Sequence, residues 1–517
     1  MVRSAVLALA ILGGASLALA FTFAAAWPAV FVAVAAFVLS LEWSAGRSRA
    51  LLCAALFGWV AYVGGFFWTQ PALALFWDGR AALSWGVWLL WGGVVTLRFV
   101  VIGSIYCALR RRRVGLVASS LLAWVTVEWL YPSLFPFYLG NTLVDQAVLA
   151  QCAALGGPLL LSAWVCGVSA TLAEGLLWLE SRRPPARVES SAVVVATLAL
   201  LLYGSFAIKA VERESNAAPA ITVGIVQANV DVIEKRAERL LSHRRYAAQS
   251  QGLDAGGSVD LLIWPETSYL RALPDVLPAD GTAVRGSLRV PLLFGGIRAR
   301  TKEGNRERFN SAMIVDADGT IRSAYDKHFL IPFAEFVPFG DRFAAWARLA
   351  PTLSHFRAGE DFSALRFGPW RIATPICYET IRPAYVRKLV LESNPHLLVS
   401  LTNDGWFGDS PEPHIHLALA RLRAIEHRRY LVRATNTGIS AVVDPAGRTV
   451  AESHLFEATN LKHTVRMLDG PTIYRALGDW PGYLAAFLLL VVLATRRRAT
   501  DSRRASRRKT PPEAPAA

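Results

Sequence analysis

The sequence predicts a helical membrane bundle of about eight transmembrane helices joined to one α/β domain. Of its 517 residues, 54% are hydrophobic and 17 are tryptophans, which is too apolar for a wholly soluble enzyme of this length. The net charge is +15, but the basic residues lie in short clusters between apolar segments. That pattern is typical of a membrane protein and argues against a nucleic-acid-binding face.

Seven apolar segments precede residue 211, and each is about long enough to cross a ~30 Å hydrocarbon core as a helix. They are approximately residues 4–21, 22–41, 51–69, 82–109, 114–131, 155–179 and 191–209. An eighth segment covers 483–495, or begins at Trp480 if Trp480 and Pro481 are included. The first segment also resembles a signal peptide, but the second follows at once, so an uncleaved first helix is expected.

Every second loop between these segments is basic, which predicts the orientation of the chain. Arginines follow the second, fourth, sixth and eighth segments, at positions 47, 49, 110–113, 182, 183, 187 and 496–498. The opposite loops are nearly free of basic residues, since Arg80 is the only Lys or Arg in 70–81 and 132–150 has none. The basic loops and both termini should therefore face the cytoplasm, with the long segment before the eighth helix facing outward.

Four units follow from this pattern. We expect transmembrane helices in 1–210, an outward-facing catalytic domain in 211–479, a last transmembrane helix in 480–496 and a basic, disordered cytoplasmic tail in 497–517.

Within 211–479, apolar strands alternate with helices, which indicates an α/β domain. Strands are expected at 221–228, 261–264, 291–296, 370–377 and 397–402, a hairpin at 309–326 and a last pair of strands at 430–453. Helices are expected at 233–251, 382–391 and 413–429. The pair Gly295-Gly296 is interpreted as a tight turn.

Cys377 is the residue around which the domain is organised. It lies at a sharp turn between an apolar strand and a helix, where the helix N-terminus should favour the reactive thiolate. The other cysteines lie in or beside apolar segments of the N-terminal half: Cys53, Cys107, Cys152 and Cys166. Cys377 is therefore the sole thiol of the outward domain, with neither a local disulfide partner nor metal-ligand spacing. The alternative interpretation is a buried structural cysteine.

Three charged residues at or near strand ends complete a candidate site with this cysteine. Glu266 ends a strand where α/β domains place catalytic groups, and it can accept the thiol proton. Lys327 can stabilise an oxyanion, helped by the N–H of Tyr378. Glu335 lies among apolar neighbours and should be paired or functional. The alternatives are a helix cap for Glu266 and a surface position for Lys327. Together the residues indicate acyl transfer through a thioester.

Several motifs resemble known families. Trp264-Pro-Glu266, Lys327 with Pro332-Phe-Ala-Glu335, and Ile376-Cys-Tyr-Glu379 resemble the Glu-Lys-Cys signature of the nitrilase, or carbon–nitrogen hydrolase, superfamily. Membrane helices before and after such a domain resemble the bacterial apolipoprotein N-acyltransferase family. Further similar stretches are Asn403-Asp-Gly-Trp-Phe-Gly408, His416, Arg423-Ala-Ile-Glu426 and Arg433-Ala-Thr-Asn-Thr-Gly438.

The resemblance implies a nitrilase-like α-β-β-α sandwich in which Glu266, Lys327 and Cys377 are catalytic. It also implies supporting roles for Glu335, Tyr378 and Glu379. There are two departures from the family pattern, which usually has Gly at the position of Ala334 and His-Leu at the positions of Phe329-Leu330, whereas this chain has His328 one place earlier. Both departures lie in or near the loop that carries Glu335, where they bear on packing, and they leave the three catalytic residue types in place.

The resemblance further implies that a phospholipid such as phosphatidylethanolamine donates an acyl chain to Cys377. The amino group of an S-diacylglyceryl-cysteine on an apolipoprotein would then accept it, in the bacterial inner membrane with the catalytic domain periplasmic. Trp406, Phe407 and the run 336–356 are candidate lipid-contacting lids, with core packing as the equal alternative. No cofactor is expected, and no metal site, because His414 and His416 do not share a helix face. A monomer is expected.

Two other functions remain open at this stage. A membrane-tethered nitrilase-like amidase would hydrolyse the thioester with water. A non-enzymatic lipid-binding or lipoprotein-binding module would tolerate Cys377→Ala.

Overall fold

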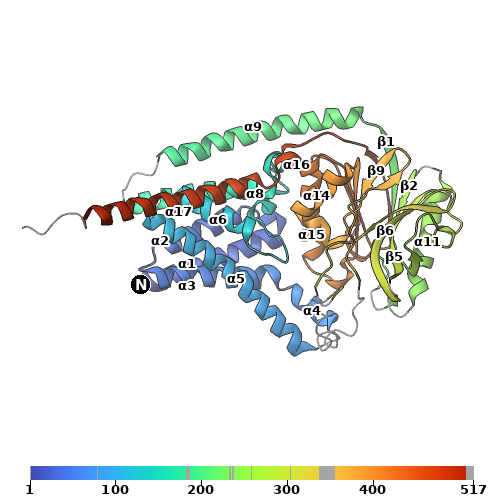
Figure 1. Cartoon of the computed structure of the whole chain (residues 1–517), viewed down its shortest axis with the longest axis horizontal. Coiled ribbons are helices and arrows are strands. Elements are labelled where there is room, and N and C mark those ends of the chain that lie inside the picture. The colour runs from blue at the N-terminus through green and yellow to red at the C-terminus, as the bar shows by residue number, and fades with distance from the viewer. Residues whose placement is uncertain are drawn as a thin grey trace, which may run out of the picture.

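The protein is seen here in a computed structural model that describes residues 2–77, 80–181, 187–231, 234–235, 238–257, 259–302, 304–332, 334–336 and 356–507. A bundle of long helices lies beside an α/β domain (Figure 1). The chain enters the α/β domain from α9 (Arg187–Ala217) and returns to the bundle through α17 (Trp480–Arg507).

The bundle follows the predicted apolar segments closely. Besides α9 and α17, its longer helices are α1 (Val2–Thr22), α2 (Ala29–Glu42), α3 (Arg47–Phe66), α5 (Ala81–Arg111), α6 (Leu116–Leu130) and α8 (Ala153–Ser181). Its connections contain η1 (Ala24–Ala26), α4 (Thr69–Phe76), η2 (Leu139–Leu143) and α7 (Ala147–Ala150). Within the described residues, 5 helices are long and apolar enough to cross a membrane, and shorter apolar helices cover Ala29–Glu42, Leu116–Leu130 and Trp480–Thr495.

The bundle exposes apolar side chains on its outer surface, as a membrane protein does. On α9, for example, Val195 is 65% exposed and Phe206 is 71% exposed. Inside the bundle, Phe37 and Phe57 are buried and pack edge to face, with ring centroids 4.8 Å apart. A large apolar outer surface suits hydrocarbon surroundings and would be costly in water.

The basic helix ends gather at one end of the bundle. At the end of α5, Arg110 pairs with Glu42 of α2 at 2.8 Å, and Trp43 donates to Glu180 at the end of α8 at 2.9 Å. Figure 1 places the start of the chain and the end of α17 at the end of the bundle away from the α/β domain. Arg182 and Arg183 lie outside the described residues.

The α/β domain contains two sheets. One has 8 strands in the order β14-β1-β2-β5-β6-β7-β4, with β3 on β5, and the other has 6 in the order β13-β12-β11-β10-β9-β8. The strands are β1 (Ala220–Gln227), β2 (Leu261–Ile263), β3 (Tyr269–Pro274), β4 (Ala279–Asp280), β5 (Leu292–Lys302), β6 (Asn305–Val315), β7 (Thr320–Asp326), β8 (Leu365–Phe367), β9 (Trp370–Ala373), β10 (Leu397–Thr402), β11 (Leu431–Thr435), β12 (Ala441–Val443), β13 (Thr449–Glu452) and β14 (Thr459–Arg466).

The two sheets pack face to face between helices, so the predicted α-β-β-α arrangement is present. Fully buried Ile225 and Val399, one from each sheet, belong to the core between them. On the first sheet's other face lies α11 (Arg239–Ala255), where Tyr246 packs on Trp264. The second sheet is covered by α14 (Pro383–Ser393) and α15 (Glu412–His427), which lie between it and the bundle (Figure 1). Short helices α12 (Thr282–Arg285), η3 (Cys377–Ile381), η4 (Asp404–Trp406) and α16 (Ile473–Leu477) complete the domain and its exit.

Some predicted boundaries differ from the structure. The strand expected at 370–377 ends at Ala373, and the region 430–453 holds three strands, with the turn at 444–447 joining β12 and β13. At the domain boundaries, α9 continues past residue 210 to Ala217, and α17 continues past 496 to Arg507 where a disordered tail was expected. The rest of that tail lies outside the described residues.

Candidate active site

Glu266 is held at the carboxyl end of β2 by a turn that packs against a glycine. Thr267 in this turn has φ 51°, in the left-handed region. A Cβ on Gly295 of the adjacent strand β5 would lie 2.6 Å from the Cα of Glu266. The interpretation of Gly295-Gly296 as a tight turn is therefore wrong, because both residues lie within β5, and Gly295 lets the Glu266 turn approach.

Lys327 follows β7 and joins two carboxylates in the domain interior. Its side chain is 1% exposed, and its Nζ donates to Oε1 of Glu266 at 3.2 Å and to Oε1 of Glu335 at 2.9 Å. Asn310 on β6 donates its Nδ2 to the same two oxygens, at 2.7 and 3.1 Å. The expectation that Glu335 is paired is thus confirmed, and its partner is Lys327. Burial by itself lowers the pKa of Lys327, but Glu266 and Glu335 raise that pKa well above its ordinary value, so the ammonium stays charged.

Cys377 begins η3, close to this charged cluster. Its φ is 50°, in the left-handed region, and its preceding residue Ile376 pairs with Leu401 of β10 in an isolated bridge. The helix N-terminus was expected to favour the thiolate, but the surroundings of the thiol favour its protonated form. Burial raises the pKa of Cys377 well above its ordinary value, and the carboxylate of Glu266 adds to this, against the charge of Lys327. The ammonium already faces two carboxylates, so it cannot offset a third anion.

Glu379 ties the cysteine turn to the segment that carries Lys327. Its Oε1 accepts from the N–H groups of His328 at 2.7 Å and Phe329 at 3.1 Å. Its Oε2 accepts from the N–H of Ile376 and the hydroxyl of Tyr325, both at 2.8 Å. Burial nevertheless raises the pKa of Glu379. The departure from the family pattern at His328-Phe329 leaves this link intact, because it uses backbone N–H groups that any residue except proline supplies.

An apolar cavity of about 290 Å³ reaches Cys377 from the membrane part of the chain. Phe407 and Tyr378 line its domain side, where Phe407 meets Trp68 and Tyr378 meets Phe135, with ring centroids 5.5 and 5.8 Å apart. The hydroxyl of Tyr378 also donates to the carbonyl of Leu134. Of the two candidate lid aromatics, Phe407 lines the cavity, whereas Trp406 lies outside its lining. Residues 337–355 of the proposed lid run lie outside the described residues.

Comparison with known proteins assigns this chain to a family. Residues 13–171 match the apolipoprotein N-acyltransferase N-terminal domain, and residues 222–469 match the carbon-nitrogen hydrolase family. The apolipoprotein N-acyltransferase of Rhodopseudomonas palustris is 31% identical over 523 residues, which cover 93% of each chain. The chain belongs to the apolipoprotein N-acyltransferase family.

A second relative matches most of the chain, whereas a solved structure matches about half of it. The apolipoprotein N-acyltransferase of Geobacter metallireducens is 29% identical over 484 residues, covering 91% of each chain. The crystal structure of Saccharomyces cerevisiae Nit3, from the nitrilase superfamily, is similar to 48% of this chain and 90% of its own length, with 17% identity and a TM-score of 0.36. The similarity to the two bacterial acyltransferases thus extends through both the membrane part and the α/β domain.

Sequence reasoning missed two polar residues beside Glu266, Asn310 and Lys235. Asn310 donates to the carboxylates of both Glu266 and Glu335. It lies inside a strand, and no sequence motif marks it. Lys235 donates its Nζ to Oγ1 of Thr267 at 2.9 Å, and burial lowers the pKa of that lysine to about 8. Only the assembled fold brings these residues to Glu266.

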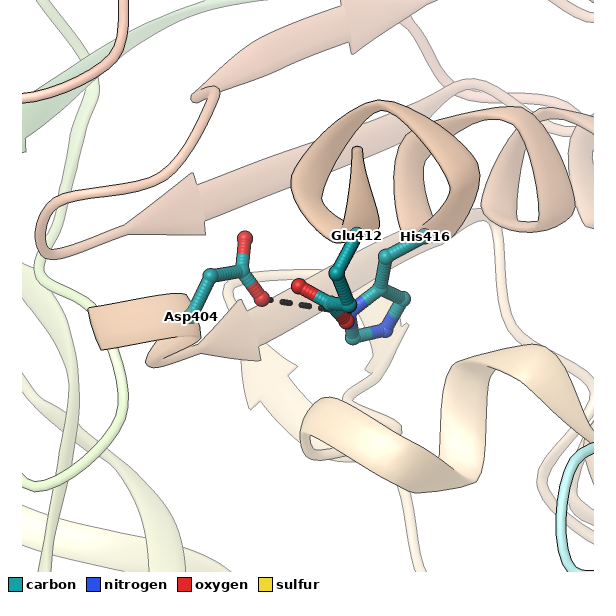
Figure 2. A group of neighbouring side chains, drawn as sticks. All are labelled: Asp404, Glu412 and His416. Carbon is teal, nitrogen blue, oxygen red and sulfur yellow. Dashed lines mark hydrogen bonds and ion pairs between the residues drawn. The ribbon is translucent and has the colours of Figure 1, made fainter. Parts of the chain in front are cut away.

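A second buried cluster lies behind the cysteine turn. Asp404, Glu412 and His416 offer ligand-type atoms that all lie within 4.8 Å of one another (Figure 2). Reasoning from the pair His414 and His416 missed this group, because the acidic partners come from η4 and from the start of α15. The spacing of Glu412 and His416, four residues apart on one helix, was the available signal.

Proposed function

We propose that this protein transfers a fatty acyl chain from a phospholipid to the N-terminal amino group of an S-diacylglyceryl-cysteine on an apolipoprotein, through a thioester on Cys377. The observation that supports the proposal is that Cys377 lies between a charged cluster and an apolar cavity. The cluster consists of Glu266, Lys327 and Glu335, and the cavity extends to Trp68 of the membrane part. Membership of the acyltransferase family supports the same substrates.

In the first half-reaction, Sγ of Cys377 attacks the carbonyl carbon of the ester while Glu266 takes the thiol proton. A base is needed because the buried thiol is protonated at rest. Lys327 and the N–H of Tyr378 stabilise the oxyanion of the tetrahedral intermediate. Collapse breaks the C–O bond, Glu266 returns the proton to the leaving alkoxide, and the lysophospholipid departs.

In the second half-reaction, the amino group of the acceptor attacks the thioester carbonyl and Glu266 removes a proton from that nitrogen. The same two donors hold the new oxyanion, the C–S bond breaks, and the thiolate takes the proton back from Glu266. The amide product then leaves a free thiol. One difficult transfer is thereby divided into two easier ones.

We assign supporting roles to the residues around this triad. Glu335 holds and orients Lys327, and Glu379 fixes the segments that carry Lys327 and Cys377 relative to each other. Phe407 and Tyr378 form the domain's side of the acyl site, and Trp406 precedes Phe407 outside the cavity lining.

We further propose that 1–210 and 480–496 are held in the inner membrane, with 211–479 on the periplasmic side and 497–517 in the cytoplasm. The gathering of basic helix ends away from the α/β domain supports this orientation. A membrane-impermeant lysine or thiol reagent applied to spheroplasts should label the 211–479 region. Labelling of a cysteine placed at Ser502 under the same conditions would reverse the proposed topology.

The decisive experiment separates the two half-reactions. Incubation with phospholipid alone should add one acyl mass to the peptide that contains Cys377, and neutral hydroxylamine should remove it. Adding a diacylglyceryl lipopeptide should discharge the adduct onto the lipopeptide. Cys377→Ala should give neither adduct nor product, and Cys377→Ser at best a slow, hydroxylamine-resistant adduct.

The other functions predict different results. In a membrane-tethered amidase, water would discharge the acyl adduct without lipopeptide. In a non-enzymatic binding module, Cys377→Ala would behave as the wild type in lipid or lipoprotein binding and neither protein would acquire an acyl mass. Transfer at wild-type rate in Cys377→Ala would show that the nucleophile is misassigned.

A further inference from the structure

His416 connects the second buried cluster to the backbone of the nucleophile. It lies on α15 and is 5% exposed. Its Nε2 is 3.3 Å from the carbonyl oxygen of Cys377. Its Nδ1 is 3.1 Å from Oδ1 of Asp404 and 3.3 Å from Oε1 of Glu412. Figure 2 shows Asp404 and Glu412 approaching the imidazole from the same side, that of Nδ1.

The partners of His416 decide its protonation state. A carbonyl oxygen only accepts hydrogen bonds, so Nε2 must carry a proton. Asp404 is ionised, because Arg433 donates to its Oδ2 at 2.6 Å, and that charge holds the pKa of Asp404 below its ordinary value despite burial. Nδ1 therefore faces an acceptor as well. Only the doubly protonated imidazolium satisfies both contacts.

Three charged residues surround His416, and they come from three different elements. Asp404 lies in η4, Glu412 lies on α15 itself, and Arg433 lies on β11. Burial and Arg433 lower the pKa of His416, but its hydrogen bonds to Asp404 and Glu412 and the charge of Asp404 raise it above the ordinary value. The same donor atoms are of the kind that bind a metal cation, but the guanidinium of Arg433 already occupies one carboxylate oxygen.

The carbonyl that His416 contacts belongs to the same peptide group as the N–H of Tyr378. In a trans peptide the C=O and N–H point in opposite directions. A hydrogen bond to the oxygen therefore fixes where that N–H points. Tyr378 lies in the first turn of η3, where amides have no acceptor within the helix and are free to bind an oxyanion.

We propose that His416 is a positioning residue: its imidazolium, held by Asp404 and Glu412, binds the Cys377 carbonyl and so aims the Tyr378 N–H at the oxyanion. The inference rests on the proposed function. It adds to that function a residue that contacts the peptide group of the oxyanion donor but does not touch the reacting atoms. The contact also restrains the left-handed backbone of Cys377, which a non-glycine residue adopts at a cost.

The test compares single-turnover acylation of Cys377 by phospholipid in three variants. Removing an oxyanion donor outright costs about 10²–10³-fold. His416→Leu leaves the donor present but unaimed, so acylation should slow by about tenfold to thirtyfold, and discharge to lipopeptide by the same factor. His416→Gln keeps one donor and should lose only about threefold. His414→Gln is the matched control, because His414 is an exposed residue of the same helix, and it should match the wild type.

Alkylation of Cys377 by iodoacetamide, read by mass spectrometry of its peptide, separates positioning from structural damage. Alkylation forms no oxyanion, so its rate should be unchanged in His416→Leu. Wild-type acylation in that variant, or parallel loss of acylation and alkylation, would overturn the proposal. Stoichiometric divalent metal in the purified wild type, lost in Glu412→Gln, would overturn it too. If wild-type protein is alkylated at Cys377 but never acylated, the proposed function itself fails, and the inference with it.

Discussion

The two sides of Cys377 differ in composition and in origin. The charged side comes entirely from the α/β domain, through Glu266, Asn310, Lys327 and Glu335. The apolar side comes largely from the membrane part, including Trp68, Trp91 and Phe135, which line the cavity.

This difference separates the chemistry from the choice of substrate. The α/β domain holds a charged cluster whose members satisfy one another, as a buried charge requires. The membrane part lines an apolar cavity that suits an acyl chain. Under the proposed function, an acyl-enzyme at this boundary would be protected from hydrolysis until an amine arrives, as an acyltransferase needs and an amidase does not.

Breaking the charged side should have the largest effect. Lys327→Met leaves the carboxylates of Glu266 and Glu335 facing each other without a cation, and it removes an oxyanion donor. We expect acylation of Cys377 to fall by about 10³-fold in a single-turnover assay. Lys388→Met is the matched control, because the side chain of Lys388 is 56% exposed, where it pairs with Glu392 and lies over the ring of Phe362. Comparable losses in both variants would contradict a special role for Lys327.

Weakening the charged cluster while keeping Lys327 should reduce activity less than Lys327→Met does. Glu335→Gln keeps the shape of the side chain but removes one of the two charges that hold Lys327. We expect the rate of N-acylation to fall by about 10²-fold, with membrane insertion and thermal stability near those of the wild type. Near-normal turnover would show that Glu335 is a structural residue of its loop.

The protonation state of Cys377, which lies between the charged and the apolar side, can be tested through the pH dependence of its alkylation. Because burial and Glu266 raise the pKa of Cys377, its thiolate appears only as the pH rises through that raised value. Alkylation by iodoacetamide should then increase about tenfold per pH unit and still be rising above the ordinary thiol pKa of ~8.5. A plateau below pH 8 would mean that the thiolate is already formed at neutral pH. Mass spectrometry of the Cys377 peptide resolves it from the four other cysteines.

Altering the apolar side should change chain-length preference more than chemistry. Trp68→Ala removes a buried aromatic wall of the cavity that contacts Phe407. Long-chain donors should lose about 1 kcal/mol, or about fivefold in acylation rate, relative to a short-chain phospholipid. Trp178→Ala is the control, because Trp178 is 41% exposed on the bundle surface. An equal loss for both chain lengths would place Trp68 outside the acyl site.

Local patterns in the sequence were enough for much of the architecture. Long apolar segments predicted the longer helices of the bundle, because hydrocarbon imposes both length and composition. These are α1, α2, α3, α5, α6, α8 and α9. Alternation of strands and helices predicted the α/β domain, and chemically distinct residues at strand ends predicted Glu266, Lys327 and Cys377. The sequence also predicted that Glu335 is paired or functional, since an acid among apolar neighbours needs a partner.

Only the tertiary structure decided how these residues behave together. The thiol of Cys377 rests protonated because burial and Glu266 raise its pKa while Lys327 already faces two carboxylates, a balance that no spacing in the sequence reveals. Gly295 proved to support the Glu266 turn, because the close approach of β5 comes from sheet pairing. His416 reaches the carbonyl of Cys377 across 39 positions of the chain. Such contacts depend on distances between separate elements, and those distances are set only when the sheets, helices and membrane bundle pack.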